Sequence, residues 1–243
     1  MLPTSRLNNI VYDMNTFGIC VVDGFLGPAR AESVRKEAIG ILNENKHLFK
    51  NGQLINDTAS RGGLVVRGDK IAWLDGSESF CSYTNNFTRS LDSVIAHCVA
   101  NDATGELGLH KISRRTKAML ACYPGSGTRY FKHVDNPNFD GRKISCVYYL
   151  NKDWDVERDG GALRIYPEEH PDQMATVHPI LDRLVLFWAD RRNPHEVMPA
   201  ARCRLSITLW YFDDNELAMQ TCINSALQQR IQDMEPFSQR DEG

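Results

Sequence analysis

The spacing of hydrophobic residues predicts one strand and two helices in the first hundred positions. Residues 17–22 are an apolar, β-branched run, which predicts a strand. After Gly27 and Pro28, apolar residues recur at helical spacing over 29–48, and a second such pattern covers 88–100. Between them, 50–66 is rich in Gly and Asn and leads into a short strand at 70–74. We expect 50–66 to be a long, mobile and functional loop, because idle loops of that length are uncommon.

From residue 117 onward the pattern changes to short apolar runs separated by Gly, Pro, Asn and Asp. These runs, at 117–124, 143–151, 161–167, 183–189, 196–200 and 204–213, predict strands of a sandwich or jelly roll. Residues 215–234 return to helical spacing, so we expect helices at both ends to support a β core. The predicted fold is α+β and mainly β, with a double-stranded β-helix (jelly-roll) core. It is one domain over 1–243, with helical support over about 1–112, the β core over about 113–213 and a C-terminal helix over about 214–235.

Composition narrows the class of protein. The chain has 243 residues, of which 42% are hydrophobic and 24% charged, as in one globular domain. Its net charge of -3 argues against nucleic-acid binding driven by electrostatics alone. No segment reads as a signal peptide or a membrane span, and the seven cysteines contain no Cys-x-x-Cys pair. We therefore expect an intracellular protein with no nucleic-acid or membrane partner, no disulfide framework and no structural zinc.

A candidate metal site begins at His133-Val134-Asp135. If this segment is an extended strand, the imidazole and the carboxylate lie on the same face and can bind one ion. A surface His and Asp pair is the commoner reading of these three residues alone. His195 follows after a strand and a turn, and two His with one carboxylate form the facial triad of non-haem Fe(II) oxygenases.

The strand at 204–213 predicts a polar cavity beside this site. Its alternation places Arg204, Ser206, Thr208 and Trp210 on one face, opposite Leu205, Ile207, Leu209 and Tyr211. An Arg is rarely buried without an anionic partner, and its planar fork suits a carboxylate. Tyr149 alternates with Val147 and Ser145, so its hydroxyl can enter the same cavity. The alternatives are an exposed sheet face with an ordinary surface Arg, and a Tyr packed in the core.

Several runs of residues resemble the catalytic domain of the prolyl hydroxylases of hypoxia-inducible factor (HIF). They are RTKAMLACYPG, HVDNPN, DGRKISCVYYLNKDW, GGALRIYPE, DRLVLFWADRRNPHEV and ITLWYFD. The resemblance extends from about residue 17 to about 212 and is densest over 115–212. His-x-Asp with a distal His and Arg is shared by the wider dioxygenase superfamily, whereas HVDNPN and DRRNPHEV point to this family. Residues 52–66 depart most from its pattern.

The resemblance assigns roles to individual residues. It implies that His133, Asp135 and His195 bind Fe(II), and that these three with Arg204 are catalytic. It implies that 2-oxoglutarate is held by Arg204, Tyr149 and Thr208 in a pocket lined by Tyr123, Met119, Val147, Leu163, Val197 and Trp210. Substrate-side positions would be Arg67, Asp69, Trp73, Tyr130, Arg142 and Trp210, and the peptide would also contact the 52–66 loop and the C-terminal helix.

The family's activity implies a 2-oxoglutarate-dependent dioxygenase that 4-hydroxylates a proline in an LxxLAP-type motif of a HIF alpha subunit. Such an enzyme uses O2 as co-substrate and ascorbate as reductant, acts as an oxygen sensor, and marks its substrate for ubiquitin-mediated degradation. The resemblance also implies a monomer in the cytoplasm and nucleus. Two alternatives stay open, namely a prolyl hydroxylase of a ribosomal or elongation-factor substrate and a catalytically silent, cupin-like binding module.

Overall fold

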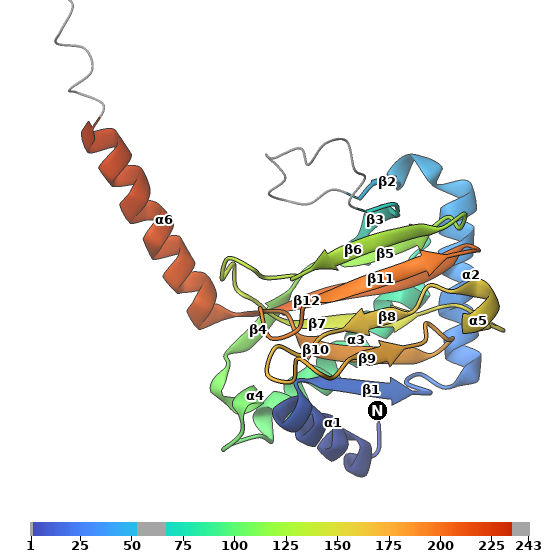
Figure 1. Ribbon diagram of the computed structural model, residues 1–243, viewed down its shortest axis with the longest axis horizontal. Helices are drawn as coiled ribbons and strands as arrows, with labels where there is room; N and C mark the ends of the chain where they lie inside the picture. Colours follow the sequence, from blue (N-terminus) through green and yellow to red (C-terminus); the bar gives the residue numbers. More distant parts are fainter. Residues whose placement is uncertain (1, 53–66, 235–243) are drawn as a thin grey trace, which may run out of the picture.

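The computed structural model describes residues 2–52 and 67–234, with side chains up to residue 230 (Figure 1). Its helices are α1 (Thr4–Phe17), α2 (Pro28–Glu44), α3 (Ser82–Ala100), the short α4 (Glu106–Leu109) and α5 (Val156–Asp159), and α6 (Asp214–Met234), with a 3-10 turn at Lys46–Leu48. The predicted mobile loop lies almost wholly outside the described residues, since 53–66 are not described.

Two antiparallel sheets form the core of the described chain. The larger, eight-stranded sheet runs β1 (Ile19–Asp23), β10 (Arg183–Trp188), β7 (Arg142–Tyr149), β12 (Arg204–Asp213), β5 (Ala118–Tyr123), β3 (Lys70–Leu74) and β2 (Lys50–Asn51), with β4 (Ile112–Arg115) also paired to β12. The smaller, four-stranded sheet runs β6 (Thr128–His133), β11 (His195–Ala200), β8 (Leu163–Ile165) and β9 (Ala175–Val177). Together they form a double-stranded β-helix, as predicted.

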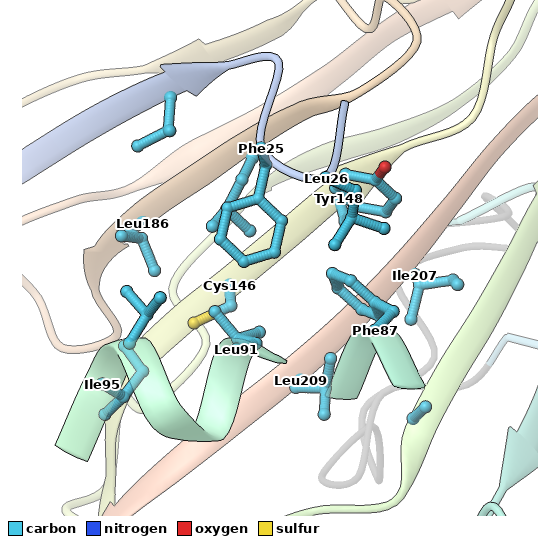
Figure 2. Packing of buried hydrophobic residues seen from close by; sticks show 14 of the residues in the cluster. Phe25, Leu26, Phe87, Leu91, Ile95, Cys146, Tyr148, Leu186, Ile207 and Leu209 are labelled. Carbon is cyan, nitrogen blue, oxygen red and sulfur yellow. The ribbon is translucent and has the colours of Figure 1, made fainter. Parts of the chain in front are cut away.

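Helices cover one face of the larger sheet. In Figure 2, Phe87, Leu91 and Ile95 of α3 point toward the side chains of β7, β10 and β12. Phe87 stacks on Tyr148 with ring centroids 4.5 Å apart, and Leu91 is fully buried. Four alternate residues of β12, Leu205, Ile207, Leu209 and Tyr211, belong to this core. The helix-covered face is therefore the structural core, and the other face of the same strands is left for a cavity.

Helix α1 is capped by Gly18, which lies against the Trp188 ring. Gly18 adopts a left-handed conformation with φ of 68°, and its N–H donates to the Met14 carbonyl, which closes α1. A β-carbon at this position would lie 3.0 Å from the Trp188 ring. The Trp188 indole N–H in turn donates to the Met14 carbonyl, so α1 is fixed against β10.

Several predicted boundaries are wrong. The first strand begins at Ile19, because Phe17 is the last residue of a helix that was not predicted. The helix expected over 29–48 ends at Glu44, and the one expected over 88–100 begins earlier, at Ser82. Four strands, β2, β4, β6 and β9, were not predicted, and β2 lies in the segment expected to be a loop. The strand at 70–74 and the strand at 204–213 are confirmed.

The C-terminal helix does not support the core along its length. It covers 214–234, as predicted, but Figure 1 shows it projecting away from the sheets. Its first turns contact β12 and β4, and every residue from 221 to 230 is exposed. Among the helices of the described residues, none is long and apolar enough to cross a membrane.

Candidate active site

Three metal-binding side chains converge at the junction of the two long strands of the smaller sheet. His133 is the last residue of β6, His195 is the first residue of β11, and the two are direct partners in the ladder. The Nε2 atoms of His133 and His195 lie 3.6 and 3.7 Å from Oδ1 of Asp135. One ligand atom from each residue lies within 4.8 Å of the others. The predicted triad is therefore assembled in space.

The geometry that brings Asp135 to the site differs from the predicted one. Strand β6 ends at His133, so Asp135 is not two places along an extended strand. It lies in a bend, where the Ser145 hydroxyl of β7 donates a hydrogen bond of 2.6 Å to its Oδ2. The bend and Ser145 therefore direct the carboxylate between the two imidazoles.

Backbone carbonyls fix the orientation of both imidazoles. Nδ1 of His133 lies 2.8 Å from the Phe131 carbonyl, and Nδ1 of His195 lies 3.0 Å from the Asn193 carbonyl. A carbonyl can only accept, so each Nδ1 carries the proton and each Nε2 keeps its lone pair for a metal. The Tyr130 ring stacks on His133 with centroids 3.6 Å apart, which restricts the ring further.

The protonation states suit metal binding at neutral pH. Burial, together with the neighbouring His133, lowers the pKa of His195 to about 4, so this imidazole is neutral at pH 7. Burial alone would raise the pKa of Asp135, but the two histidines and Ser145 outweigh it and hold that pKa well below its usual range. Two imidazoles and one carboxylate are the donor set of non-haem Fe(II) sites, which leaves three of six positions open.

The cavity that the triad lines also holds a buried cation. Arg204 is 1% exposed, and its Nε donates to the Gly161 carbonyl at 2.8 Å. Its guanidinium lies 5.1 Å from the Tyr123 ring centroid and 5.0 Å from that of Tyr149. Within the part of the chain that the structure describes, no carboxylate forms an ion pair with it. A buried cation without an internal anion indicates an anionic ligand.

The Tyr149 hydroxyl is a second buried polar group of this cavity, and it lacks a partner within the described part of the chain. Tyr149 is fully buried, and its hydroxyl has no hydrogen-bond partner among the described residues. A buried hydroxyl that makes no hydrogen bond costs about 1–3 kcal/mol, so such a group is normally satisfied by a ligand or water. Arg204 and Tyr149 therefore form a floor suited to a carboxylate.

The alternation predicted for β12 and β7 is confirmed. Leu205, Ile207, Leu209 and Tyr211 lie in the helix-covered core. The cavity is lined by all of the residues predicted to hold or surround a co-substrate: Arg204, Tyr149, Thr208, Tyr123, Met119, Val147, Leu163, Val197 and Trp210. These lining residues come from five strands of the two sheets, so the cavity forms only when both sheets are folded.

The predicted substrate-side residues line the same cavity, with one exception. Arg67, Trp73, Tyr130, Arg142 and Trp210 line it, with the Trp73 and Trp210 centroids 6.1 Å apart. Asp69 does not line it. Asp69 is 2% exposed and receives two hydrogen bonds from Arg67, of 2.7 and 2.6 Å. Its contact is therefore with Arg67, which lies over the Tyr130 ring at 4.5 Å.

Three residues of the site were not predicted to act there. Ser145 holds Asp135, Phe187 packs edge-on against His195 at 4.8 Å, and Asn136 follows Asp135 and donates to the Arg142 carbonyl and to Glu216. Ser145 shares a face with Val147 and Tyr149, which was the available signal. Asn136 and Phe187 lie in the HVDNPN and DRLVLFWADRRNPHEV runs that carry the resemblance, but the sequence gives them no role, because their contacts depend on tertiary packing.

Comparison with known proteins gives consistent matches. Residues 118–212 match the model of the 2OG-Fe(II) oxygenase superfamily. The chain is 50% identical to human Egl nine homolog 1 over 219 residues, which are 89% of this chain and 49% of that protein. It is 44% identical to mouse prolyl hydroxylase EGLN3 over 217 residues, 89% of this chain and 87% of that protein. The chain thus spans about half the length of Egl nine homolog 1 and most of EGLN3.

A solved structure of a prolyl hydroxylase also matches this chain. A prolyl hydroxylase from Trichoplax adhaerens, in complex with a peptide fragment of the HIF oxygen degradation domain, aligns with a TM-score of 0.79 and 42% identity. The alignment covers 88% of this chain and 92% of that one.

Proposed function

We propose that this chain, which belongs to the HIF prolyl hydroxylase family of 2-oxoglutarate- and Fe(II)-dependent oxygenases, 4-hydroxylates a proline in an LxxLAP-type segment of a HIF alpha subunit. The observation that carries the proposal is the buried, unpaired cation of Arg204 beside the unpartnered Tyr149 hydroxyl, on the same cavity as the His133, Asp135 and His195 triad. A metal-binding cupin has no need of that carboxylate site, which weighs against a silent binding module.

Each residue has a task in this reaction. His133, Asp135 and His195 would hold Fe(II), which supplies oxygen activation when bound. Arg204 would bind the distal carboxylate of 2-oxoglutarate through its fork, and the Tyr149 hydroxyl would donate a hydrogen bond to it. The Thr208 hydroxyl faces the same cavity and would add a further contact.

The apolar walls would exclude water and fix the direction in which the co-substrate lies. Met119, Val147, Leu163, Val197 and Trp210 line the cavity with apolar side chains. Exclusion of water strengthens the interaction between Arg204 and a carboxylate, because charges attract more strongly where the effective dielectric constant is low. The protein therefore contributes orientation and electrostatics to chemistry that the iron carries out.

The cavity is larger than a small co-substrate requires. The described residues enclose a cleft of about 2390 Å³. Pockets for drug-sized ligands are commonly about 300–1000 Å³, so there is room for a polypeptide beside 2-oxoglutarate. Trp73 is 46% exposed at its mouth, and with Arg67 and Arg142 it would form the contact surface for an extended peptide. The 52–66 loop and α6 would complete the peptide site.

The proposed role is oxygen sensing. O2 would be the co-substrate and ascorbate the reductant, and the hydroxyproline would mark the HIF alpha subunit for ubiquitin-mediated degradation. The enzyme would act as a monomer in the cytoplasm and nucleus. A proline of a ribosomal protein or elongation factor is the alternative substrate, and the following experiment separates the two.

The test incubates the reduced, iron-loaded chain with an LxxLAP peptide, 2-oxoglutarate and ascorbate under air. We expect succinate release and the gain of one oxygen atom on the proline, both lost when 2-oxoglutarate is omitted. A matched peptide with Ala in place of that proline should gain no oxygen. Succinate release without peptide oxidation would reject the HIF-type substrate. If the protein binds iron but releases no succinate, the proposal that it is a 2-oxoglutarate-dependent dioxygenase is rejected.

Two variants test the assignment of the site. His195→Ala removes a metal ligand and should abolish turnover, whereas Arg204→Ala should chiefly raise the half-saturating concentration of 2-oxoglutarate. Met198→Ala is the matched control for His195→Ala, since Met198 lies on the same strand and does not line the cavity. Wild-type activity in both site variants would show that the assignment is wrong.

A further inference from the structure

Two cysteines that are distant in the sequence lie in contact beside the carboxylate site. Cys122 belongs to β5, and Cys203 immediately precedes β12. Their Sγ atoms are 3.4 Å apart, and both are free thiols. Cys122 is 4% exposed, whereas Cys203 is exposed to solvent. A buried thiol is therefore in direct contact with one that a solute can reach.

The local backbone explains why the two sulfurs meet. In the β5–β12 ladder Leu205 lies opposite Cys122 and Arg204 lies opposite Tyr123. Cys203 and Cys122 therefore point away from the cavity, on the face that carries the core. The turn after β5 packs on the segment before β12, since Ser126 and Gly127 donate to the carbonyls of residues 201 and 200 at 3.3 and 2.9 Å. This packing holds the two thiols together.

The two thiols differ in reactivity. The hydrogen bond between the two sulfurs, and then the nearby Arg202 guanidinium, lower the pKa of Cys203. The same hydrogen bond, together with burial, raises the pKa of Cys122. Cys203 is thus the exposed sulfur with thiolate character, and Cys122 is the protonated partner behind it. This asymmetry is what an oxidisable thiol with a resolving cysteine requires.

We propose that Cys203 and Cys122 are a peroxide-sensitive dithiol that closes into an intramolecular disulfide between β12 and β5. The Cys203 thiolate attacks one oxygen of hydrogen peroxide, the O–O bond breaks, and the departing hydroxide takes up a proton to leave water and a sulfenic acid. The Cys122 sulfur then attacks the Cys203 sulfur, the S–O bond breaks, and the leaving hydroxide takes the Cys122 proton. Two thiols lose two electrons in total, and one peroxide becomes two waters.

Formation of the disulfide requires a small movement of the chain beside Arg204. A disulfide bond is about 2.05 Å long, so the sulfurs must approach by roughly 1.4 Å. Cys203 lies outside β12 and follows two exposed residues, so the segment before the strand can shift toward β5. The residues next to the two cysteines, Arg204 and Tyr123, are ladder partners that face the cavity. The disulfide therefore displaces the backbone that positions Arg204.

The first readout does not depend on activity. The full-length reduced chain is treated with one equivalent of hydrogen peroxide and digested without reductant. We expect a linked peptide that joins Cys122 to Cys203, two hydrogens lighter than the sum of its parts and separated by dithiothreitol. Cys203→Ser should lose this product, and Cys222→Ser, which removes an exposed cysteine on α6, should form it at the wild-type rate. Links to Cys222, dimers joined through Cys203, or no linked peptide would each overturn the proposal.

The second readout rests on the proposed function. After peroxide is removed and iron is added afresh, the oxidised wild type should need several-fold more 2-oxoglutarate for half-maximal succinate release. Peroxide-treated Cys203→Ser should match the untreated wild type. A disulfide that leaves the 2-oxoglutarate requirement unchanged would refute the coupling to Arg204. Absence of turnover in the reduced wild type would instead count against the proposed function and would leave the disulfide result standing.

Discussion

Replacing Tyr149 by Phe tests the carboxylate site without disturbing the fold. Tyr149→Phe removes a single hydroxyl that has no partner among the described residues, and the ring that packs in the cavity stays. If that hydroxyl binds 2-oxoglutarate, the variant must lose affinity for the co-substrate. The same variant should keep its stability, because the hydroxyl makes no hydrogen bond of normal geometry with the described residues.

The size of both effects follows from the burial of this group. A hydrogen bond to a charged partner contributes about 1.5–3 kcal/mol, which corresponds to a rise of roughly 10- to 150-fold in the half-saturating concentration of 2-oxoglutarate. The free energy of unfolding of the ligand-free protein should stay the same or rise by up to about 1 kcal/mol, because an unsatisfied buried hydroxyl is removed. The variant should therefore lose affinity for 2-oxoglutarate without losing stability.

Tyr148 is the matched control, since it directly precedes Tyr149 on the same strand and points to the other face. Tyr148 is also fully buried, but its hydroxyl donates to Asp182 Oδ1 at 2.8 Å. Tyr148→Phe leaves that carboxylate with one partner fewer and should lower the free energy of unfolding by about 1–3 kcal/mol. It should leave the 2-oxoglutarate requirement unchanged.

Both variants can be measured by succinate release across 2-oxoglutarate concentrations and by urea unfolding of the ligand-free chain. The reasoning is refuted if Tyr149→Phe shifts the half-saturating concentration by less than about threefold, below the effect of one hydrogen bond to a charged group. It is also refuted if Tyr148→Phe shifts that concentration as much as Tyr149→Phe does.

Three further substitutions test other parts of the structure. Ser145→Ala removes the hydrogen bond to Asp135 and should weaken Fe(II) binding by about 10- to 100-fold, as measured by metal titration; unchanged affinity would contradict a role for Ser145 in holding the ligand. Leu91→Ala should lower the free energy of unfolding by about 2–5 kcal/mol in urea, because Leu91 is fully buried between α3 and the sheet, and a loss below about 1 kcal/mol would contradict that packing. Burial would raise the pKa of Asp190, but the Arg192 guanidinium outweighs burial and lowers that pKa in the folded protein. The pair therefore stabilises the fold above the unfolded pKa of about 4, and this contribution is lost as the pH falls. Asp190→Asn should therefore be less stable than the wild type at pH 7, with a difference that narrows toward pH 3 in urea titrations.

The sequence predicted the central strands well because both of their faces are buried and differ in chemistry. Along β12 a cation and hydroxyls alternate with Leu and Ile, and the structure places the two sets on opposite faces. Strand β6 was missed because its letters, TRYFKH, mix charged and aromatic residues, and only Tyr130 among them is buried. A short strand of this composition has no apolar run to detect.

Helix α1 was overlooked although its signal was present. Leu7, Ile10 and Met14, at helical spacing, are its buried residues. The opposite error concerns α6, where helical spacing was read as core support and the structure leaves the helix exposed. Periodicity predicts that a helix forms, but it does not show what lies against its apolar side.

In the larger sheet, adjacent residues of one strand have different roles, since one packs in the core and the next lines the cavity. Leu205 packs in the core and Arg204 faces the cavity, and the same division holds for Tyr148 and Tyr149. Because side chains alternate, neighbouring substitutions on these strands should give separable losses, of folding on one face and of co-substrate affinity on the other. The backbone is common to both faces, however, so a covalent bond formed on the core side is transmitted to the cavity side. This is the reason that a disulfide at Cys203 should alter the 2-oxoglutarate requirement, whereas Cys203→Ser, which adds no cross-link, should not.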